Sequence, residues 1–353
     1  EVMDLCLSCK ACKSECPSGV DMAKLKSEFL QHYYDANGVP FRTKLIAYLP
    51  KINSLISNFS SIVNFFLKSN LTNQLIGFSS KRNLLLLSKN TFSKWYKENI
   101  DRYKKANYPS GKVFLFVDEF TNYNESELGV KVYLLLTHLG YEVLVPKHLE
   151  SGRTFITKGL LRNAKKIATE NIMLLKDVIN PAAPLIGIEV SAILSFRDEY
   201  LDLVDSNLKS SAEIISESTF TFEEFLSSEI KKGKISSESF TNNFRKIKLH
   251  GHCQQKAIAS TKATIEVLSL PQNYMVEEIP SGCCGMAGAF GYEKEHYDLS
   301  MKVGELVLFP AIREEHSDTV ICAPGTSCRH QIKDGTDRSA FHPIEIIYDA
   351  LIK

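Results

Sequence analysis

All nine cysteines of this chain fall into two short neighbourhoods. Four lie within residues 6–16, the other five lie within residues 253–328, and none lies in the long stretch between them. Cysteines that only fill space behave as small apolar side chains and would be scattered through a core. Soft thiolates gathered in this way are typical of a metal site, so the pattern indicates a redox metalloprotein.

The first neighbourhood has the spacing Cys6-x2-Cys9-x2-Cys12-x3-Cys16-Pro17. This is the cysteine run of bacterial ferredoxins, in which the fourth cysteine ligates the other cluster of a two-cluster protein. Disulfides and zinc are the alternatives. However, four cysteines within eleven residues are too crowded for two unstrained disulfides, and zinc usually takes two separated pairs. We therefore expect a [4Fe–4S] cluster at this run.

If Cys16 serves another cluster, that cluster needs cysteines that this chain does not contain. The sequence also starts with Glu1-Val2 and enters the motif within six residues. We therefore expect the chain to be part of a longer protein that carries a further ferredoxin motif just upstream.

The length of 353 residues allows two or three domains. A net charge of +1 gives no reason to expect nucleic acid as a partner. Cysteines without disulfide-like spacing favour a reducing compartment such as the cytoplasm. The sequence has no run of 18 apolar residues, so no membrane span is expected, while peripheral contact with the inner face of a membrane stays open.

Residues 1–107 are predicted to form a helical ferredoxin-type domain and linker, with a first long helix over residues 21–34. The apolar stretch at residues 45–67, which Pro50 interrupts, is either a surface for a membrane or partner, or a set of helices packed on the next domain. Packed helices are the commoner case. From residue 108 onward, short β-branched and aromatic runs alternate with helices, which is the signature of parallel α/β units.

The α/β region is predicted to be duplicated, with one unit at residues 108–240 and a second at residues 241–353. Three pairs of segments align, each a strand that leads into a loop or helix: 112–119 with 246–253, 142–146 with 276–280, and 185–192 with 321–328. The alignment sets the cysteines of the second unit opposite other residue types: Cys253 opposite Glu119, Cys283 and Cys284 opposite Leu149 and Glu150, and Cys328 opposite Ala192. Because open α/β sheets place their sites where strands end, we expect a site in the second unit only.

Cys253, Cys283, Cys284 and Cys328 are the candidate ligands of this second metal site. The adjacent pair would form only a strained disulfide, whereas two neighbouring thiolates beside a glycine can bridge or chelate a metal. Thiolates select zinc, Cu(I) or an iron–sulfur cluster, so structural zinc and a thiol/disulfide redox site stay open as alternatives to a cluster. Cys322 is either a fifth ligand or a buried cysteine that binds nothing.

Histidines and glycines near these cysteines are candidates for shaping the site. His252, next to Cys253, is the histidine best placed to hydrogen-bond a sulfur, whereas His250, His330 and His342 are interpreted as structural. Three glycines are expected to let the backbone approach a cluster and donate N–H groups to its sulfurs: Gly282, Gly285 and Gly288. No phosphate-binding loop, catalytic triad or carboxylate pair is predicted.

Four segments carry a resemblance to known families: LHGHCQQKA at 249–257, SGCCGMAGAFGYEKEHY at 281–297, APGTSCRHQIKDG at 323–335 and SFRDEY at 195–200. They resemble the cysteine-rich CCG domain of heterodisulfide reductase subunits and the iron–sulfur subunits of glycolate oxidase, lactate-utilisation proteins and anaerobic glycerol-3-phosphate dehydrogenase. The strongest likeness is to the C-terminal iron–sulfur half of large FAD-linked oxidases of the D-lactate dehydrogenase type. It covers essentially the whole chain.

The resemblance implies an electron-transfer unit. An upstream flavin domain or subunit with FAD would oxidise a 2-hydroxy acid such as D-lactate or glycolate, and electrons would pass through the ferredoxin cluster and the CCG site to a quinone or a carrier protein. In heterodisulfide reductase the last cysteine pair is Cys-x2-Cys, but Cys322 and Cys328 are separated by five residues, which puts a five-thiolate cluster in doubt. The alternatives are a structural or interaction module with zinc or a vestigial metal site, and a thiol:disulfide reductase.

Overall fold

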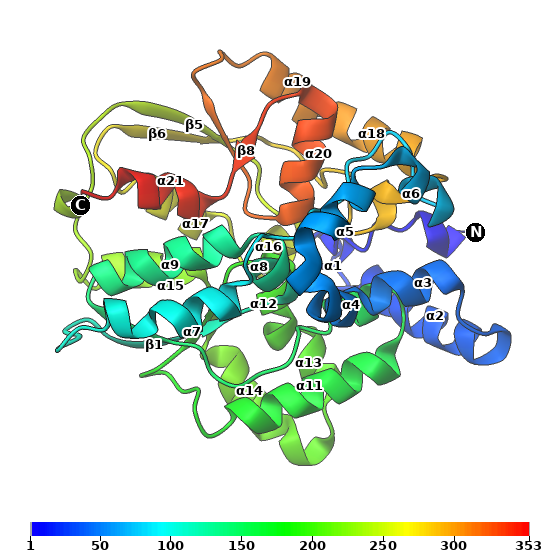
Figure 1. Ribbon diagram of the computed structural model, residues 1–353, viewed down its shortest axis with the longest axis horizontal. Helices are drawn as coiled ribbons and strands as arrows, with labels where there is room; N and C mark the ends of the chain where they lie inside the picture. The colour runs from blue at the N-terminus through cyan, green and yellow to red at the C-terminus, as the bar shows by residue number, and fades with distance from the viewer. Residues whose placement is uncertain (1, 353) are drawn as a thin grey trace.

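The structure, a computed structural model, describes residues 2–352. A helical N-terminal region precedes two parallel four-stranded sheets, as Figure 1 shows. This architecture confirms the predicted fold class. Among residues 2–352, none of the helices is both long and apolar enough to cross a membrane.

The N-terminal region contains the long helix that the sequence predicts. Helix α2 (Met22–Asn37) begins after Asp21, whose carboxylate accepts hydrogen bonds from the backbone N–H groups of Ala23 and Lys24. The other α-helices of this region are α1 (Ala11–Glu15), α3 (Phe41–Ala47), α4 (Leu49–Ile56), α5 (Ser60–Leu67), α6 (Asn70–Leu75) and α7 (Phe92–Tyr103). Residues 76–91 contain no helix, so the region is less helical than expected.

The apolar stretch at residues 45–67 forms parts of α3, α4 and α5. Its buried positions include the polar side chains of Asn53 and Ser60, whereas Leu55, Phe59 and Phe65 are 77%, 63% and 75% exposed. The side chain of Asn53 is therefore better covered than those of its apolar neighbours. Ala47 nevertheless lies fully buried in a cluster with Phe155, and α3 and α4 contact helices of the next unit, so the stretch is partly packed on the next domain and partly exposed.

The first α/β unit is built on a sheet with the strand order β2-β1-β3-β4. Its strands are β1 (Gly111–Phe116), β2 (Tyr141–Leu144), β3 (Leu185–Gly187) and β4 (Thr219–Thr221). Its helices are α8 (Glu119–Tyr123), α9 (Ser126–His138), α10 (Arg153–Thr157), α11 (Leu161–Leu175), α12 (Val190–Ile193), α13 (Glu199–Leu203), α14 (Lys209–Glu217) and α15 (Phe222–Lys231).

The second α/β unit has the equivalent strand order, β6-β5-β7-β8. Its strands are β5 (Arg245–Leu249), β6 (Tyr274–Glu278), β7 (Val320–Cys322) and β8 (Ala340–Phe341). Its helices are α16 (Cys253–Ile258), α17 (Lys262–Leu268), α18 (Tyr297–Glu305), α19 (Leu308–Arg313), α20 (Thr326–Thr336) and α21 (Pro343–Ala350). Short 3-10 helices lie at Val2–Leu5, Ser57–Phe59, Leu194–Arg197, Ser206–Leu208, Ser237–Ser239 and Phe290–Tyr292.

The two sheets also agree in the pairing of their central strands. That pairing follows the predicted alignment: Phe114 with Leu185 in the first sheet, and Lys248 with Ile321 in the second. Relative to the predicted alignment, the pairing of β1 with β2 and the pairing of β5 with β6 differ by one residue. The positions that follow the central strands can therefore be compared directly between the units.

The two units share one apolar core. Helices α9 and α15 of the first unit pack against α21 and α17 of the second, and one cluster of buried side chains includes residues from both sheets. A second contact joins the residues that follow β3 and β7, because Glu189 accepts a hydrogen bond from the backbone N–H of Thr326 at 3.0 Å. The ends of the second sheet's strands are consequently covered by the first unit.

Candidate metal centre

The second unit brings its cysteines together where its strands end. Cys253 is the first residue of α16, which follows β5, and Cys328 lies in the first turn of α20, which follows β7. Cys283 and Cys284 lie in the loop after β6. Parallel strands end at one edge of a sheet, so three separate loops deliver four thiols to one place.

These four thiols form a continuous chain of hydrogen-bonding contacts, from Cys253 to Cys283, from Cys283 to Cys284 and from Cys284 to Cys328. The contact with Cys283, followed by burial, raises the pKa of the Cys253 thiol well above its ordinary value. Bound metal ions reverse this preference, because a coordinating thiol is deprotonated outright. Cys284 and Cys328 are buried and Cys253 and Cys283 are half-buried, and such a group of soft donors that are protonated on their own fits a metal or cluster.

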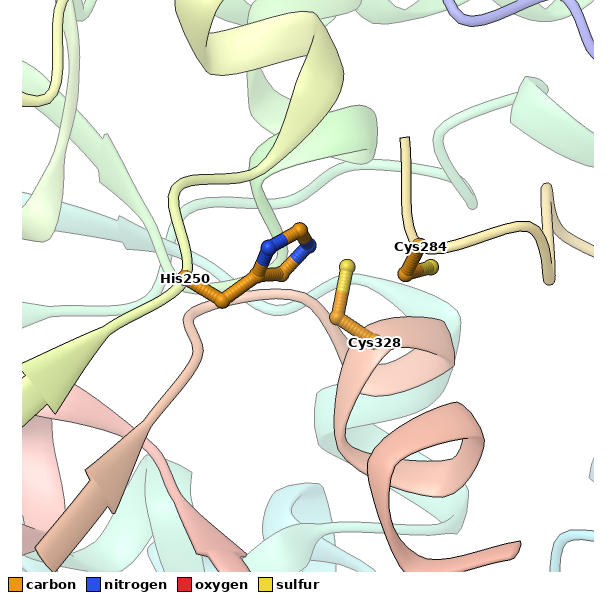
Figure 2. Close-up of side chains that lie close together, drawn as sticks. All are labelled: His250, Cys284 and Cys328. Carbon is orange, nitrogen blue, oxygen red and sulfur yellow. The ribbon is translucent and has the colours of Figure 1, made fainter. Parts of the chain in front are cut away.

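His250 belongs to the same cluster. It follows β5 directly, and one of its ring nitrogens lies within 4.8 Å of the sulfur atoms of Cys284 and Cys328. Figure 2 shows the three side chains together. Burial, with smaller effects from Lys256 and His252, lowers the pKa of His250 to about 3, so the ring is neutral. The sequence interpretation of His250 as a structural residue missed this position.

His252, which the sequence favoured as the histidine that hydrogen-bonds a sulfur, lies outside the group formed by His250, Cys284 and Cys328. It precedes α16 as its N-cap, and its Nδ1 accepts a hydrogen bond from the backbone N–H of Gln254 at 3.3 Å. Burial lowers the pKa of His252, against the opposing effect of Glu189. A role of His252 toward a cluster sulfur stays a prediction.

His330 and His342 lie outside the group formed by His250, Cys284 and Cys328. His330 lies on α20, and burial lowers its pKa. His342 is the N-cap of α21, where its Nδ1 accepts a hydrogen bond from the backbone N–H of Ile344 at 3.1 Å. The capping bond of His342 fits the structural interpretation.

Cys322 is separated from the other cysteines. It is fully buried in β7 as part of the shared apolar core. Burial raises the pKa of its thiol, and the charged groups that act on it are Glu223, Arg329 and Glu345 rather than any thiol. This surrounding favours the alternative in which Cys322 is a buried cysteine without a ligand role.

The glycines differ in how tightly the site constrains them. Gly285 has a φ of +93°, and a Cβ there would lie 2.2 Å from the carbonyl oxygen of Ser300. Its backbone N–H lies 3.4 Å from Cys283 Sγ, which fits the predicted donation to sulfur. Gly288 also has a positive φ, but nothing crowds it closely, and Gly282 lies in open space.

Gly325 was not recognised in the sequence. A Cβ at this position would lie 2.4 Å from Cδ2 of His252 and 3.3 Å from Cys328 Sγ. Only glycine lets the backbone before α20 approach both side chains this closely. The Pro-Gly pair at 324–325 is the signal that could have identified it.

The ferredoxin run lies beside this centre. Helix α1 packs against α16, the helix that begins with Cys253. Burial raises the pKa of Cys9, with smaller contributions from the nearby thiols of Cys253, Cys12 and Cys6. Cys9 therefore lies within electrostatic reach of both cysteine groups.

Cys16 differs from the other three cysteines of the run. The backbone N–H groups of Val20, Ser18 and Gly19 lower the pKa of its thiol, with burial as a minor opposing effect. No other cysteine is among the groups that act on it. This separation fits the prediction that Cys16 serves a different cluster.

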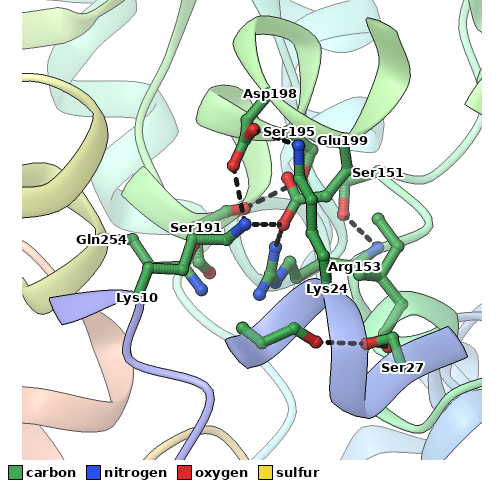
Figure 3. A network of polar contacts seen from close by, with 12 residues as sticks. Lys10, Lys24, Ser27, Ser151, Arg153, Ser191, Ser195, Asp198, Glu199 and Gln254 are labelled. Carbon is green, nitrogen blue, oxygen red and sulfur yellow. Dashed lines mark hydrogen bonds and ion pairs between the residues drawn. The ribbon is translucent and has the colours of Figure 1, made fainter. Parts of the chain in front are cut away.

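Charged side chains hold the run in place, as Figure 3 shows. The buried ammonium group of Lys10 lies 2.6 Å from Asp198 and 3.1 Å from Glu199, and Lys13 and Lys24 also bind Asp198. Burial alone would raise the pKa of Asp198, but hydrogen bonds from the three lysines outweigh it and hold that pKa well below its ordinary value. The segment at 195–200 thus anchors the cysteine loop to the first unit.

Comparisons with known proteins agree with this arrangement. No family model and no solved structure matches the chain. The chain is 24% identical over 365 residues to D-2-hydroxyglutarate dehydrogenase of Escherichia coli, covering 99% of the chain and 34% of that protein. Nearly the whole chain is therefore similar to about a third of this dehydrogenase.

Two further relatives are similar to the chain. D-2-hydroxyglutarate dehydrogenase of Haemophilus influenzae is 24% identical over 99% of the chain and 35% of its own length. One subunit of the anaerobic glycerol-3-phosphate dehydrogenase of Escherichia coli is 27% identical over 90% of the chain and 79% of its own length. The chain thus spans about a third of the D-2-hydroxyglutarate dehydrogenases that it matches, and its homologues are oxidoreductases.

Proposed function

We propose that this chain is the electron-transfer part of a dehydrogenase that oxidises a 2-hydroxy acid. The observation that carries the proposal is the contact between α1 and α16, which brings the ferredoxin run and the second cysteine group together. The thiol of Cys253 is close enough to Cys9 to contribute to the raised pKa of the Cys9 thiol. Two adjacent redox centres form a path for electrons.

The residues fit iron–sulfur clusters at both places. Cys6, Cys9 and Cys12 would hold a [4Fe–4S] cluster, and Cys16 would ligate a cluster from elsewhere in the protein. Cys253, Cys283, Cys284 and Cys328 would hold the second centre. A bound cluster supplies one-electron chemistry, and the chain's own contribution is to fix the loops that carry the thiols and to shield the thiols partly from solvent.

The relatives favour D-2-hydroxyglutarate as the substrate of the complete protein, in place of the D-lactate or glycolate suggested by the sequence. FAD on an upstream domain or partner subunit would remove the electrons from the substrate. The similarity to one subunit of a glycerol-3-phosphate dehydrogenase supports a separate flavin subunit as the alternative arrangement. A quinone or a carrier protein would then receive the electrons.

Anaerobic purification tests this proposal. Iron, sulfide and zinc should be quantified, and EPR spectra should be recorded before and after addition of dithionite. We expect iron and sulfide in near-equal amounts and a signal that appears on reduction. Zinc without iron, or a folded protein without any metal after reconstitution with iron and sulfide, would contradict an electron-transfer function.

The contacts among the thiols give weight to a second candidate, a structural zinc module. Four thiols, each in contact with the next, would also suit a single metal ion with four sulfur ligands. A structural zinc site would be redox-silent, and a chelator would unfold the protein. Dithionite reduction followed by EPR separates this candidate from the first.

A further inference from the structure

We propose that His250 is itself a ligand of the second metal centre, through Nε2, alongside the four cysteines. This inference rests on the proposed metal-binding function. It assigns the additional ligand to a histidine instead of to Cys322, which is buried in a strand of the core. The centre would then have mixed sulfur and nitrogen ligation.

The backbone of β5 fixes the position of His250. β5 lies between β6 and β7, and the backbone N–H of His250 donates a hydrogen bond to the carbonyl oxygen of Cys322 at 2.8 Å. The side chain therefore emerges where the strands end, between the loops that carry Cys284 and Cys328. Figure 2 shows the imidazole ring directed toward these two thiols.

The hydrogen bonding of the ring leaves one nitrogen for a metal. Nδ1 lies 2.7 Å from Oγ of Ser281, and that Oγ is 3.5 Å from the carbonyl oxygen of Ile279. If Ser281 donates to Ile279, it accepts from Nδ1–H, and the lone pair is then on Nε2. Metal-binding histidines usually have their other nitrogen held in this way, which fixes the tautomer and the ring orientation.

Nε2 of His250 is buried and has no hydrogen-bond partner in the part of the chain that the structure describes. Most buried polar side-chain atoms have a partner, because leaving one unpaired is unfavourable. Here the unpaired nitrogen is beside sulfur atoms that are themselves candidate ligands. A metal would satisfy Nε2 and the thiols together.

The first α/β unit provides an internal comparison. In the alignment of 112–119 with 246–253, the position of His250 is occupied by Phe116, which is fully buried and packs against Phe196. The unit without cysteines thus has an apolar ring where the unit with cysteines has an imidazole. If His250 had a purely structural role, there would be no reason for the imidazole to occur in the same unit as the cysteines.

Pulsed EPR on histidine-labelled protein tests the proposal. Cys9→Ser and Cys12→Ser together remove the ferredoxin cluster held by this chain, and a coupling that depends on His250 then identifies the signal of the second centre. Anaerobic samples would be prepared with 14N- and 15N-labelled histidine and reduced with dithionite. We expect a strong nitrogen coupling that changes with the isotope, is lost in His250→Ala and persists in His342→Gln.

The outcomes separate this inference from the proposed function. A loaded, reducible centre without histidine coupling, or with a coupling that survives His250→Ala, overturns the role of His250 and leaves electron transfer intact. The isotope experiment uses unsubstituted His250, so the absence of a histidine coupling overturns the proposal even if His250→Ala does not fold. If the site holds zinc, X-ray absorption that shows sulfur and nitrogen supports His250 ligation, and sulfur alone overturns it. Protein that binds no metal overturns both proposals.

Discussion

The two α/β units have the same strand order but place different chemistry where their strands end. In the first unit, Glu119 aligns with Cys253, and its carboxylate accepts hydrogen bonds from the backbone N–H and the hydroxyl of Ser151 at 3.0 and 2.8 Å. Asn171 bridges the neighbouring loop to Tyr200. The side chains of Glu119 and Asn171 are thus satisfied within the protein, while Oε1 of the adjacent Glu150 has no hydrogen-bond partner among residues 2–352.

In the second unit, the corresponding side chains lack such hydrogen bonds to other parts of the chain that the structure describes. Its four thiols contact mainly each other, and Nε2 of His250 has no partner. The same topology can therefore place either hydrogen-bonded polar side chains or a group of thiols that fits a metal where its strands end. Glu189 links the two cases, because it belongs to the first unit and binds the start of α20 in the second.

The largest expected effect is a loss of iron from the second unit. Cys284→Ser removes the thiol between Cys283 and Cys328, so the iron content of the second centre should fall about tenfold or more. Iron and sulfide analysis with EPR measures this loss. Cys322→Ser is the matched control, because its thiol is in the core strand, and its iron content should stay unchanged. Equal iron losses in the two variants would contradict our assignment of ligands.

The next effect concerns the loop that joins the ferredoxin run to the first unit. Asp198→Ala removes the shared partner of Lys10, Lys13 and Lys24, and should destabilise the docked loop by about 3 kcal/mol, mostly through the buried Lys10. Faster hydrogen exchange over residues 6–16 would report this change. Asp202→Ala is the control, since Asp202 is exposed and pairs with Lys24 alone.

The pH dependence of this docking follows from the lowered pKa of Asp198. A carboxyl group whose pKa is lower in the folded state stabilises that state above its unfolded pKa, and this contribution disappears as pH falls through the folded pKa. The native protein should therefore keep its loop protected at pH 5 and lose protection only in stronger acid. Loss of protection between pH 5 and 7 would contradict the role of Asp198.

Much of the fold was predictable because local patterns determine it. The cap at Asp21, the alternation of short apolar strands with helices, and the repeated strand order are all local or periodic signals. The cysteine spacing likewise located both candidate centres. These features do not depend on knowing which distant segments meet.

The remaining features depend on such long-range contacts. His250 and His252 are two residues apart, and only the path of the loop after β5 decides that His250 is directed at the thiols while His252 caps a helix. The sequence also could not show that Asp198 binds Lys10, which lies 188 residues away. Spacing identifies candidate ligands, but tertiary packing selects among them.

A smaller effect tests the hydrogen-bond network around Asn171 in the first unit. The side chain of Asn171 accepts from the backbone N–H of Leu149 and donates to the carbonyl oxygen of Glu150 and the hydroxyl of Tyr200. Asn171→Ala should lower the free energy of unfolding by about 2 kcal/mol without changing the iron content, because the bonds are buried and remote from the thiols. Urea unfolding and iron analysis measure the two quantities. Loss of iron would show that the network supports the metal centre after all.

The smallest effect compares the starts of α15 and α21, which both have capping boxes. Their second helical residues differ, because the first unit buries Glu223 where the second buries Ile344. Burial raises the pKa of Glu223 to about 7.

An acid with a raised pKa in the folded state costs stability as pH rises from its unfolded pKa to its folded one, and the full cost applies above about pH 7. Glu223→Gln should therefore increase the free energy of unfolding by about 1 kcal/mol at pH 8 and by almost nothing at pH 4, as chemical unfolding at both pH values would measure. Glu224→Gln, which weakens the ion pair with Arg197, should instead decrease stability at pH 8. A loss of stability in both variants at pH 8 would mean that the first unit makes use of the buried charge.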